Sequence, residues 1–405
     1  MGQVHQRLYG DNMPKIKFLD LGMQPIANRF LSSSDQIENE YKFHLTVTFD
    51  EETKLVSLCD FVSPELMFND SYVYYSSLSK TMRSHFNDIA LKIDYKFLPK
   101  NILEIGSNDG VFLKNFGTER AISVEPCGNF AKMTRNLGYT TYCEFWTKDL
   151  AEKIISNHGK QDLIFSANCM CHIQNLEEAF DLISKTLSDR GVFIFEDPSL
   201  LKMMERRSYD QIYDEHAHIF SIISLSRILS NYNLEIFNVE NLGVHGGSNR
   251  VYVCHSGARN IDCSVKENLD RENIFGLNNI NAYIRFSEDV ARSKIQLLDF
   301  LSEFKRNGYK IVSYGATSKS ATVFNYCGID KNLIDYIVDT TKDKQGKLSP
   351  GVHIPVVSPE DGFDNSVDYA FLGAWNYEEE IKKKESKFLK SGRFISHVPY
   401  VRIIK

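Results

Sequence analysis

The sequence predicts an α/β protein made of more than one unit. From residue 101 to about residue 242, short apolar runs alternate with segments of helix length, which is typical of a parallel sheet with crossover helices. A second strand, turn and helix pattern covers 311–320, and the residues before 60 alternate like antiparallel strands. Because 405 residues exceed one ordinary core, we expect two or three domains.

The first expected unit is a small domain covering residues 1–90. Segments 41–49 and 55–59 alternate between polar and apolar residues, as half-buried strands do. A helical stretch from residue 80 to about residue 96 then leads into the next unit.

The second unit covers residues 91–255 and the third covers residues 256–405. A turn-rich crossing at 243–250 precedes the last short strand of the second unit, and the third begins with one long amphipathic helix at 284–307. The strands expected in the second unit are 101–105, 121–125, 162–167, 192–196 and 251–254, and those expected in the third begin at 311, 334 and 369.

Composition and charge exclude several classes of protein. Hydrophobic residues make up 42% of the chain and charged residues 25%, as in ordinary globular proteins. The 47 basic and 53 acidic residues leave a net charge of −6 without a long basic run, so neither nucleic acid nor an anionic membrane is an expected partner. No apolar run approaches the ~20 residues of a membrane span, and the polar N-terminus lacks the apolar segment of a signal peptide. Eight scattered cysteines without a C-x-x-C pair predict reduced thiols in a cytoplasmic protein.

The run from Asn101 to Gly110 is the most informative motif. An apolar strand enters a turn that holds two glycines and no bulky side chain, so backbone amides can approach a ligand. The next apolar segment, 121–125, ends in Glu125. In an open α/β sheet, an acid at this strand tip hydrogen-bonds a ribose diol. Together these features predict a pocket for an adenosine-containing cofactor.

The residues of the turn and their spacing favour S-adenosylmethionine as the cofactor. Gly106 and Gly110 enclose three residues, including Asn108 and Asp109, and this spacing does not match the dinucleotide pattern G-x-G-x-x-G. Asp109 and Glu104 would repel a pyrophosphate, whereas a sulfonium and an ammonium group suit acidic neighbours. The turn resembles motif I of the class I methyltransferases. A nicotinamide enzyme and a purely structural turn are the alternatives.

Other candidate cofactor residues follow later strands. Glu144 is placed to accept from an adenine amino group, and the amide of Phe145 can serve a ring nitrogen. An ordinary strand-end acid beside core aromatic residues is the alternative. Asn168 ends the next strand, where doubly wound sheets bind ligands. His172 lies four residues further on, with a structural or a catalytic role.

The densest polar cluster of the chain is 208–218, which holds two tyrosines, three carboxylates and two histidines. Glu215, His216 and His218 could ligate a divalent ion. However, adjacent side chains point in different directions, so Glu215 and His216 would not easily share one metal. An acid–base role needs only one group aimed at the substrate, and histidine titrates near neutral pH.

Two further stretches suit an anionic ligand. One carries hydroxyl groups and two cations before and within the first expected helix; its candidates are Tyr72, Tyr74, Ser76, Ser77, Lys80 and Arg83. The other, 315–319, places small residues and Lys319 at a helix start, where amides and the helix dipole favour phosphate. It is not a P-loop, and ordinary turn and capping chemistry is the alternative for both.

Seven sequence blocks, in the same order and near the same spacing, resemble the S-adenosylmethionine-dependent sugar C-methyltransferases that act on nucleotide-linked 4-keto-6-deoxy sugars. The resemblance extends from about residue 18 to the C-terminus. It implies a class I (Rossmann-like) methyltransferase domain flanked by a small N-terminal α+β domain and a C-terminal α/β domain that closes over the nucleotide sugar. The blocks are 19–28, 104–110, 195–198, 209–216, 244–247, 314–322 and 339–345.

The resemblance also implies residue roles. His216 matches the base proposed to remove the proton at C3, alpha to the C4 ketone, with Tyr213 and Glu215 beside it. Tyr74 and His172 match other active-site positions, whereas His245, Gly246 and Gly247 fall in a block expected to bind substrate. Because a hydrogen alpha to a ketone is weakly acidic, its removal requires a base and donors at the enolate oxygen. The alternatives are an O- or N-methyltransferase of nucleotide sugars and an inactive nucleotide-sugar-binding homologue.

The chain departs from this family in its first domain. Members usually carry two C-x-x-C pairs that hold structural zinc, whereas this chain has no cysteine before Cys59. Only His5 precedes Leu19 as a soft ligand, and 50–53 has no cysteine where the second pair would fall. We therefore predict that this domain folds without zinc and that catalysis uses no metal. The sequence holds no pattern that indicates an oligomeric state.

Overall fold

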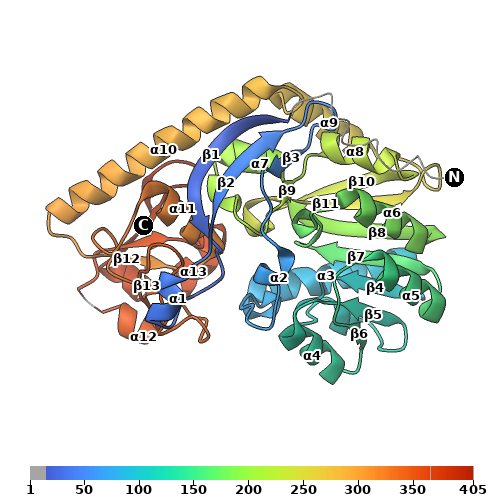
Figure 1. Ribbon diagram of the computed structural model, residues 1–405, viewed down its shortest axis with the longest axis horizontal. Coiled ribbons are helices and arrows are strands. Elements are labelled where there is room, and N and C mark those ends of the chain that lie inside the picture. Colours follow the sequence, from blue (N-terminus) through green and yellow to red (C-terminus); the bar gives the residue numbers. More distant parts are fainter. Residues whose placement is uncertain (1–14, 365, 405) are drawn as a thin grey trace.

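A computed structural model describes residues 15–364 and 366–404, which form three sheets flanked by helices (Figure 1). The sheets contain four, seven and six strands, respectively. The fold is α/β, with the seven-stranded sheet in the middle of the sequence. No helix among the described residues is both long and apolar enough to span a membrane.

The four-stranded sheet combines the N-terminal region with a strand from the middle of the chain. Strands β1 (Ile16–Pro25), β2 (Lys42–Phe49) and β3 (Val56–Leu58) pair in antiparallel fashion. Strand β9 (His218–Ile219) pairs with β3 and completes the sheet, directly after His216. The short helices of this region are α1 (Ser34–Glu38), α2 (Pro64–Met67) and η1 (Ser76–Leu78).

The seven-stranded sheet has the order β10-β11-β8-β7-β4-β5-β6. Five of these strands, from β6 to β8, are parallel, whereas β11 is antiparallel to both β8 and β10. Because β4 has neighbours on both sides that follow it in sequence, the carboxyl ends of β4, β5 and β7 mark a ligand-binding edge. The bounds are β4 Ile102–Ile105, β5 Ala121–Val124, β6 Thr140–Tyr142, β7 Gln161–Ala167, β8 Leu187–Pro198, β10 Leu234–Leu242 and β11 Ser248–His255.

Helices cover both faces of this sheet with apolar side chains. Helix α3 packs on one face through Met82, Phe86 and Ile89, and helices α5, α6 and α8 pack on the other. The helical segments of this region are α3 (Lys80–Phe97), η2 (Leu113–Asn115), α4 (Gly128–Asn136), α5 (Lys148–His158), η3 (Met170–His172), α6 (Leu176–Thr186), α7 (Leu200–Arg206), η4 (Tyr209–Gln211), α8 (Ile222–Ser230) and η5 (Val244–Gly246).

The six-stranded C-terminal sheet has the order β14-β13-β12-β15-β16-β17 and is parallel except for β17. Its strands are β12 (Ile311–Tyr314), β13 (Ile337–Val338), β14 (Val356–Val357), β15 (Tyr369–Leu372), β16 (Arg393–Ser396) and β17 (Arg402–Ile404). The helices are α9 (Cys263–Phe275), α10 (Ile280–Arg306), α11 (Ser318–Cys327), α12 (Pro359–Gly362), η6 (Trp375–Tyr377), α13 (Glu378–Lys384) and η7 (Phe388–Lys390).

The N-terminal and C-terminal sheets share one hydrophobic core. Helix α10 runs along the outside of β1 and reaches the C-terminal sheet (Figure 1). The Phe49 ring from β2 stacks on Tyr283 of α10 at 4.5 Å between ring centroids, and Leu297 and Phe324 belong to the same buried cluster. Apolar burial therefore fixes the N-terminal strands against the C-terminal helices.

The sequence-based elements agree with the structure where the periodic signal is long. The helix expected at 80–96 is α3, and the one expected at 284–307 is α10, which begins four residues earlier. The strand expected at 334–338 begins only at Ile337. Strands β1, β6, β9, β10, β14, β16 and β17 were not predicted.

Candidate active site

The glycine turn after β4 forms the floor of a cavity of about 380 Å³. Gly106 and Gly110 both have φ of +75°, a conformation that side chains rarely adopt. A Cβ on Gly106 would lie 2.6 Å from the sulfur of Cys169, so this turn and the segment after β7 can approach only because the residue is glycine. The cavity is lined mainly by apolar and aromatic side chains, including Phe68, Phe86, Phe145, Trp146 and Ile173.

Glu125 extends into this cavity from the end of β5. Its Oε2 accepts from the amide of Asn108 at 2.7 Å, and its Oε1 accepts from the amide of Cys127 at 2.9 Å. Burial raises the pKa of the Glu125 carboxyl. Each oxygen keeps a second lone pair, which suits a ribose diol. The residues around the turn therefore fit an adenosyl group.

Asn108 and Asp109 hold the aromatic loop that precedes α3 against the glycine turn. The side-chain nitrogen of Asn108 donates to the carbonyl of Tyr74 at 2.9 Å, and its side-chain oxygen accepts from the backbone amide of Ser76 at 2.9 Å. Asp109 accepts from the amide of Ser77 at 3.0 Å. Asp109 does not line the cavity, so its role in this structure is to place the loop that carries Tyr74.

Two acids expected at the cofactor lie outside the cavity. Glu104 is buried behind the turn, where its carboxylate accepts from the amide of Leu113, and burial followed by the charge of Glu125 raises its pKa. Glu144 faces solvent and pairs with Lys153 at 3.2 Å. The next two residues, Phe145 and Trp146, line the cavity instead.

A second cavity, of about 130 Å³, adjoins the first and lies among all three sheets. The run 209–216 contributes Gln211, Tyr213, Glu215 and His216, and the C-terminal region contributes Lys319 and its neighbours. Five side chains line both cavities: Tyr72, Tyr74, Asn168, His172 and His245. We call the first the cofactor cavity and the second the acceptor cavity.

His216 is buried with its tautomer set by the backbone. Its Nδ1 lies 2.6 Å from the carbonyl of Gln211, so Nδ1 carries the proton, and Nε2 lies 2.7 Å from the hydroxyl of Tyr213. Burial lowers the pKa of His216 well below its ordinary value of 6.5, and the nearby His172 and Lys319 add to this effect. His216 is therefore neutral at pH 7, with an Nε2 lone pair available as a base.

The two carboxylates before His216 are held by the N-terminal region. Glu215 accepts from the Asn28 side-chain amide at 2.5 Å and from the Tyr72 hydroxyl at 2.8 Å. Asp214 accepts from the amide of Ala27 at 3.0 Å. Burial raises the pKa of both carboxyls. The loop after β1 thus positions the run 209–216 from outside the seven-stranded sheet.

His172 stacks between two rings at the junction of the cavities. Its ring lies 5.3 Å from Phe68 and 5.4 Å from His216, centroid to centroid. Burial lowers its pKa to about 3, and its Nε2 has no hydrogen-bond partner. Cys171, His172 and His216 have ligand-type atoms within 4.8 Å of one another. Since both nitrogens of His216 already have partners, this arrangement favours an acid–base role over metal binding.

Two lysines give the acceptor cavity positive charge. Lys344 is buried and Lys319 is half-buried; both line the cavity, and neither forms an ion pair with a described residue. Burial lowers the pKa of each amine. Part of the turn expected to bind phosphate is occupied, because Thr317 and Ser320 form a capping box and Asp339 accepts from the amide of Ala316 at 2.7 Å. The two lysines are the cationic side chains that an anion in this cavity would meet.

Several expected substrate residues do not reach the acceptor cavity. Lys80 is exposed, and Arg83 donates to the carbonyl of Ser77 at 2.5 Å. Ser76 lines the cofactor cavity instead, and Ser77 lines neither. Gly246 and Gly247 have positive φ and pack against Trp375 and Lys202, respectively, which makes them structural.

Other site residues were missing from the sequence-based set. They are Asn28, Gln211, Lys344, Asn376 and Tyr377 at the acceptor cavity and Phe68 and Trp146 at the cofactor cavity. Asn28, Gln211 and Lys344 lie within blocks already recognised, so the blocks themselves were the available signal. Asn376 and Tyr377 follow the carboxyl end of β15, where a parallel sheet binds ligands.

Comparisons with known proteins identify the family to which this chain belongs. Family models match residues 76–239 ("Methyltransferase domain") and 243–399 ("C-methyltransferase C-terminal domain"). The C-methyltransferase NovU of Streptomyces niveus is 30% identical over 393 residues, which cover 95% of this chain and 93% of NovU. The chain belongs to the C-methyltransferase family. This family member is a S-adenosylmethionine-dependent methyltransferase, with the methyltransferase fold in its seven-stranded sheet.

Solved methyltransferases overlap with less than half of the chain. A S-adenosylmethionine-dependent methyltransferase from Clostridium acetobutylicum shares 16% identity and covers 43% of this chain and 92% of its own, with a TM-score of 0.34. The plantazolicin methyltransferase BpumL, solved with S-adenosylhomocysteine, shares 12% identity and covers 44% and 86%, also with a TM-score of 0.34.

The N-terminal region matches a third family model, described as "Putative zinc binding domain", over residues 10–68. Its zinc ligands are not found in the described part of that region, residues 15–68. Cys59 is the one cysteine there, and His44 pairs with Asp20 at 2.8 Å. His5 lies outside the described residues. These donors do not fit a structural zinc site, which needs about four converging sulfur or imidazole ligands.

Proposed function

We propose that this C-methyltransferase methylates C3 of a nucleotide-linked 4-keto-6-deoxy sugar and so makes a branched-chain sugar. The contact between the two cavities is the observation that carries the proposal. A neutral, buried imidazole lies in the acceptor cavity, and the side chains at its border also line the cofactor cavity. A base beside a methyl donor suits the alkylation of a carbon acid.

In this proposal His216 removes the C3 proton. Its Nε2 accepts the proton while Nδ1 stays bonded to the Gln211 carbonyl, which stabilises the imidazolium that forms. The Tyr213 hydroxyl, 2.7 Å from Nε2, gives way to the substrate or orients it. The electron pair of the C–H bond moves into the enolate, whose oxygen needs a donor. Tyr74 and His245 border both cavities and supply candidate donors.

The cofactor cavity holds the methyl donor in the proposed reaction. When bound, S-adenosylmethionine supplies an electrophilic methyl group on a sulfonium sulfur. Glu125 would bind the ribose, Phe145 and Trp146 would pack on the adenine, and Asn168, which borders both cavities, would lie near the methionine part. The new C3–CH₃ bond forms as the S–CH₃ bond breaks, so the sulfur keeps the electron pair and the charges balance.

The nucleotide is assigned to the C-terminal side of the acceptor cavity. Lys344 is buried and Lys319 half-buried, neither forms an ion pair with a described carboxylate, and a diphosphate is an anion that would pair with both. Eight free cysteines and a nucleotide-sugar substrate are consistent with a reducing cytoplasm. The N-terminal region contributes Asn28 and Tyr72, which orient Glu215.

One experiment separates C-methylation from its alternatives. The enzyme is incubated with methyl-labelled S-adenosylmethionine and a panel of 4-keto-6-deoxy nucleotide sugars in D₂O. We expect solvent deuterium at C3 of unreacted sugar and the label on the same carbon of the product. Label on oxygen or nitrogen without C–H exchange would identify an O- or N-methyltransferase. Binding without label transfer to any sugar would identify an inactive homologue.

A further inference from the structure

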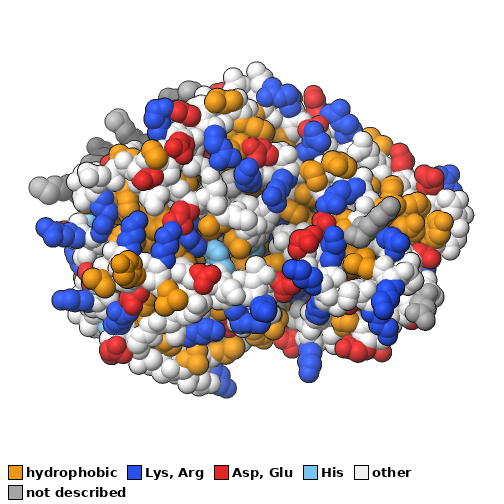
Figure 2. All heavy atoms as spheres, turned by 180° about the vertical axis from the view of Figure 1, so that it is seen from behind, with side chains coloured by type: hydrophobic (Ala, Val, Ile, Leu, Met, Phe, Trp, Pro, Cys, Tyr) orange, Lys and Arg blue, Asp and Glu red, His pale blue; other side chains and the backbone are white. Residues whose placement is uncertain are grey.

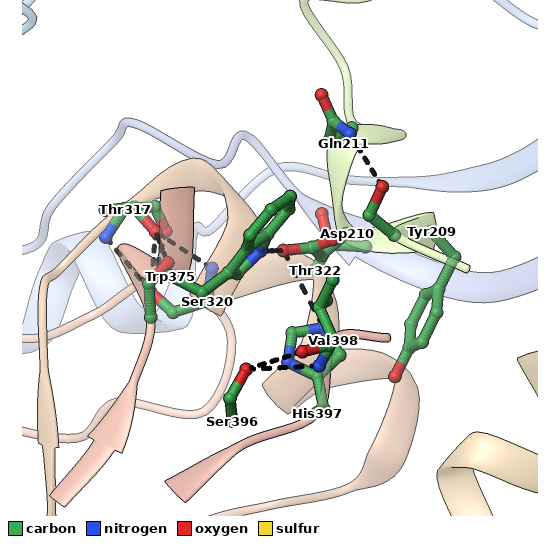
Figure 3. A network of polar contacts seen from close by, with 12 residues as sticks. Tyr209, Asp210, Gln211, Thr317, Ser320, Thr322, Trp375, Ser396, His397 and Val398 are labelled. Atoms are coloured by element: carbon green, nitrogen blue, oxygen red, sulfur yellow. Dashed lines mark hydrogen bonds and ion pairs between the residues drawn. The ribbon is translucent and has the colours of Figure 1, made fainter. Parts of the chain in front are cut away.

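A buried polar contact joins the run that carries the base to the C-terminal sheet (Figure 3). Asp210, in η4, is completely buried, and its Oδ2 accepts from the indole nitrogen of Trp375 at 2.5 Å. Its Oδ1 has no hydrogen-bond partner. The two residues lie 165 positions apart in sequence. Breaking the hydrogen bond to a buried carboxylate costs free energy, because the carboxylate then loses its donor and no water replaces it.

Asp210 is connected to His216 through its neighbour in the chain. Asp210 precedes Gln211, and the Gln211 carbonyl accepts from Nδ1 of His216. The next carbonyl, that of Ile212, accepts from the Thr322 hydroxyl of α11 at 3.1 Å. The C-terminal region therefore contacts both neighbours of Gln211, the residue whose carbonyl sets the position of the imidazole.

On the other side the contact reaches the wall of the acceptor cavity. Trp375 begins η6, whose next two residues, Asn376 and Tyr377, line that cavity. The Tyr377 hydroxyl interacts with the hydroxyl of Tyr74, which lies at the border with the cofactor cavity. Trp375 also packs on Gly246, where a side chain would collide with the indole. Its position is therefore tightly specified.

The Asp210 carboxylate also lies beside two other polar side chains. His397, after β16, is buried with its Nε2 3.7 Å from Oδ2 of Asp210, and neither of its ring nitrogens has a hydrogen-bond partner. Lys319 also feels the charge of Asp210. Figure 3 shows the indole of Trp375 and the ring of His397 on either side of this carboxylate. Asp210 is thus the centre of a contact between the base-bearing run and the acceptor-binding region.

We propose that Asp210 and Trp375 are positioning residues for proton removal: their hydrogen bond sets the His216 ring relative to the acceptor-cavity wall. Neither touches the reacting atoms. The inference rests on the proposed function for the identity of the reaction, but the position of the His216 ring does not depend on it. Misplacing a base by about 1 Å can cost on the order of 100-fold in rate.

Two readouts test this proposal with the full chain. The first is the rate of solvent exchange at C3 of a 4-keto-6-deoxy nucleotide sugar with S-adenosylhomocysteine bound. The second is the Nδ1 proton resonance of His216, observed without substrate and assigned by its loss in His216→Asn. Trp375→Phe removes the donor and keeps a ring, Asp210→Ala removes the acceptor, and Asp210→Asn keeps an oxygen that can accept. Tyr283→Phe in α10, which removes a buried hydroxyl that donates at 2.7 Å to the Leu277 carbonyl before that helix, is the matched control.

We expect Trp375→Phe and Asp210→Ala to lower kcat for exchange about 10- to 100-fold and to shift or broaden the Nδ1 proton signal. Asp210→Asn should recover most of the rate, and the pH at half-maximal rate should not move in any variant. Tyr283→Phe should match wild type. Wild-type exchange and an unchanged signal in both Trp375→Phe and Asp210→Ala would overturn the proposal. So would a displaced pH profile in Asp210→Asn, because it would make Asp210 a proton-transfer group.

The two readouts keep the proposal distinct from the proposed function. If wild type exchanges no C–H proton, the sugar reaction is wrong, and the Nδ1 signal alone decides the positioning role. If one variant fails to fold, as judged by its thermal transition, the other still breaks the same hydrogen bond from the opposite partner.

Discussion

The Nε2 of His216 lies 2.7 Å from the hydroxyl of Tyr213, and the Nδ1 of the same ring lies 2.6 Å from the carbonyl of Gln211. A backbone carbonyl can only accept, so the proton is placed on Nδ1 and the lone pair on Nε2. This one ring therefore has its tautomer set by the fold, and it lines the acceptor cavity beside His172, which borders both cavities. The first two predictions concern this ring.

His216→Asn should abolish proton removal and leave the cofactor cavity intact. The asparagine amide can still donate to the Gln211 carbonyl, but no atom replaces the basic Nε2. Since general-base catalysis contributes about 10²- to 10⁴-fold, we expect a loss of that size in C3 exchange and in methyl transfer. Calorimetric affinity for S-adenosylhomocysteine should stay within about threefold of wild type, about 0.7 kcal/mol. Full activity in this variant would remove His216 as the base.

The pH dependence of kcat/KM should lack a histidine limb near neutrality. Burial, and then His172 and Lys319, lower the pKa of His216 well below 6.5, so the base form persists as pH falls through 6.5. We expect the acid limb well below pH 6.5. Lys319→Met removes one positive neighbour and should move that limb to higher pH while raising KM for the acceptor. A limb at pH 6.5 in wild type would contradict the buried, neutral ring.

The lowered pKa values of the buried histidines also predict how the free energy of unfolding changes with pH. In the unfolded chain these histidines bind protons near pH 6.5, whereas the folded protein resists protonation of His172 until about pH 3 and of His218 until about pH 4. Their contribution to stability is therefore complete above pH 6.5 and is lost as pH falls below it. Activity below pH 6 should be measured at a temperature where circular dichroism shows a folded protein.

The cofactor cavity offers a matched pair of adjacent residues. Phe145 lines the cavity, whereas Glu144 faces solvent and pairs with Lys153. Phe145→Ala should weaken binding of S-adenosylhomocysteine about 3- to 10-fold through lost aromatic contact. Glu144→Ala should leave it unchanged, since exposed ion pairs contribute little. Titration calorimetry measures both. If Glu144→Ala proves the more damaging, the carboxylate reaches the adenine when the cofactor binds.

Local sequence signals predicted the parts of this protein whose partners lie nearby in sequence. The glycine turn with Glu125 indicated the residues of the first cavity, and the run 208–218 contains four residues that line the second. Which residues after β6 face the cavity could not be predicted, because that strand stops at Tyr142 and gives no alternation to follow. Phe145 and Trp146 line the cavity, whereas Glu144 pairs with Lys153.

The features that could not be predicted from the sequence depend on contacts between residues far apart in the chain. The two residues of β9 are too few for a periodic signal, and they form a strand only because Ser57 and Val56 pair with them. Trp375 enters the site through a hydrogen bond to a residue 165 positions away. Basic and acidic side chains are interspersed over the face shown in Figure 2, so charge alone would not mark the acceptor cavity on that face.

Asn28 should matter to catalysis although it belongs to the N-terminal region. It donates to Glu215 at 2.5 Å, and burial raises the pKa of that carboxyl, so losing the donor leaves a buried acceptor unsatisfied. Asn28→Ala should reduce the free energy of unfolding by about 1–3 kcal/mol and lower kcat more than it changes cofactor affinity. Asn332→Ala, which removes an exposed asparagine bonded only to Asp330, is the control. Equal kcat in the two variants would exclude a role for the Asn28 contact.

The N-terminal region should be stable without zinc. Its strands are buried against α10 and α11 through residues such as Phe49 and Tyr283, so the core supplies what a metal supplies in relatives with cysteine pairs. We expect the purified full chain to contain far less than one zinc per molecule by atomic emission, and excess EDTA to leave the thermal midpoint unchanged. Val47→Ala, by contrast, should destabilise by about 1–3 kcal/mol, because it opens a space at a completely buried position of β2. Stoichiometric zinc whose removal lowers the midpoint would show that ligands outside the described residues, such as His5, complete a site after all.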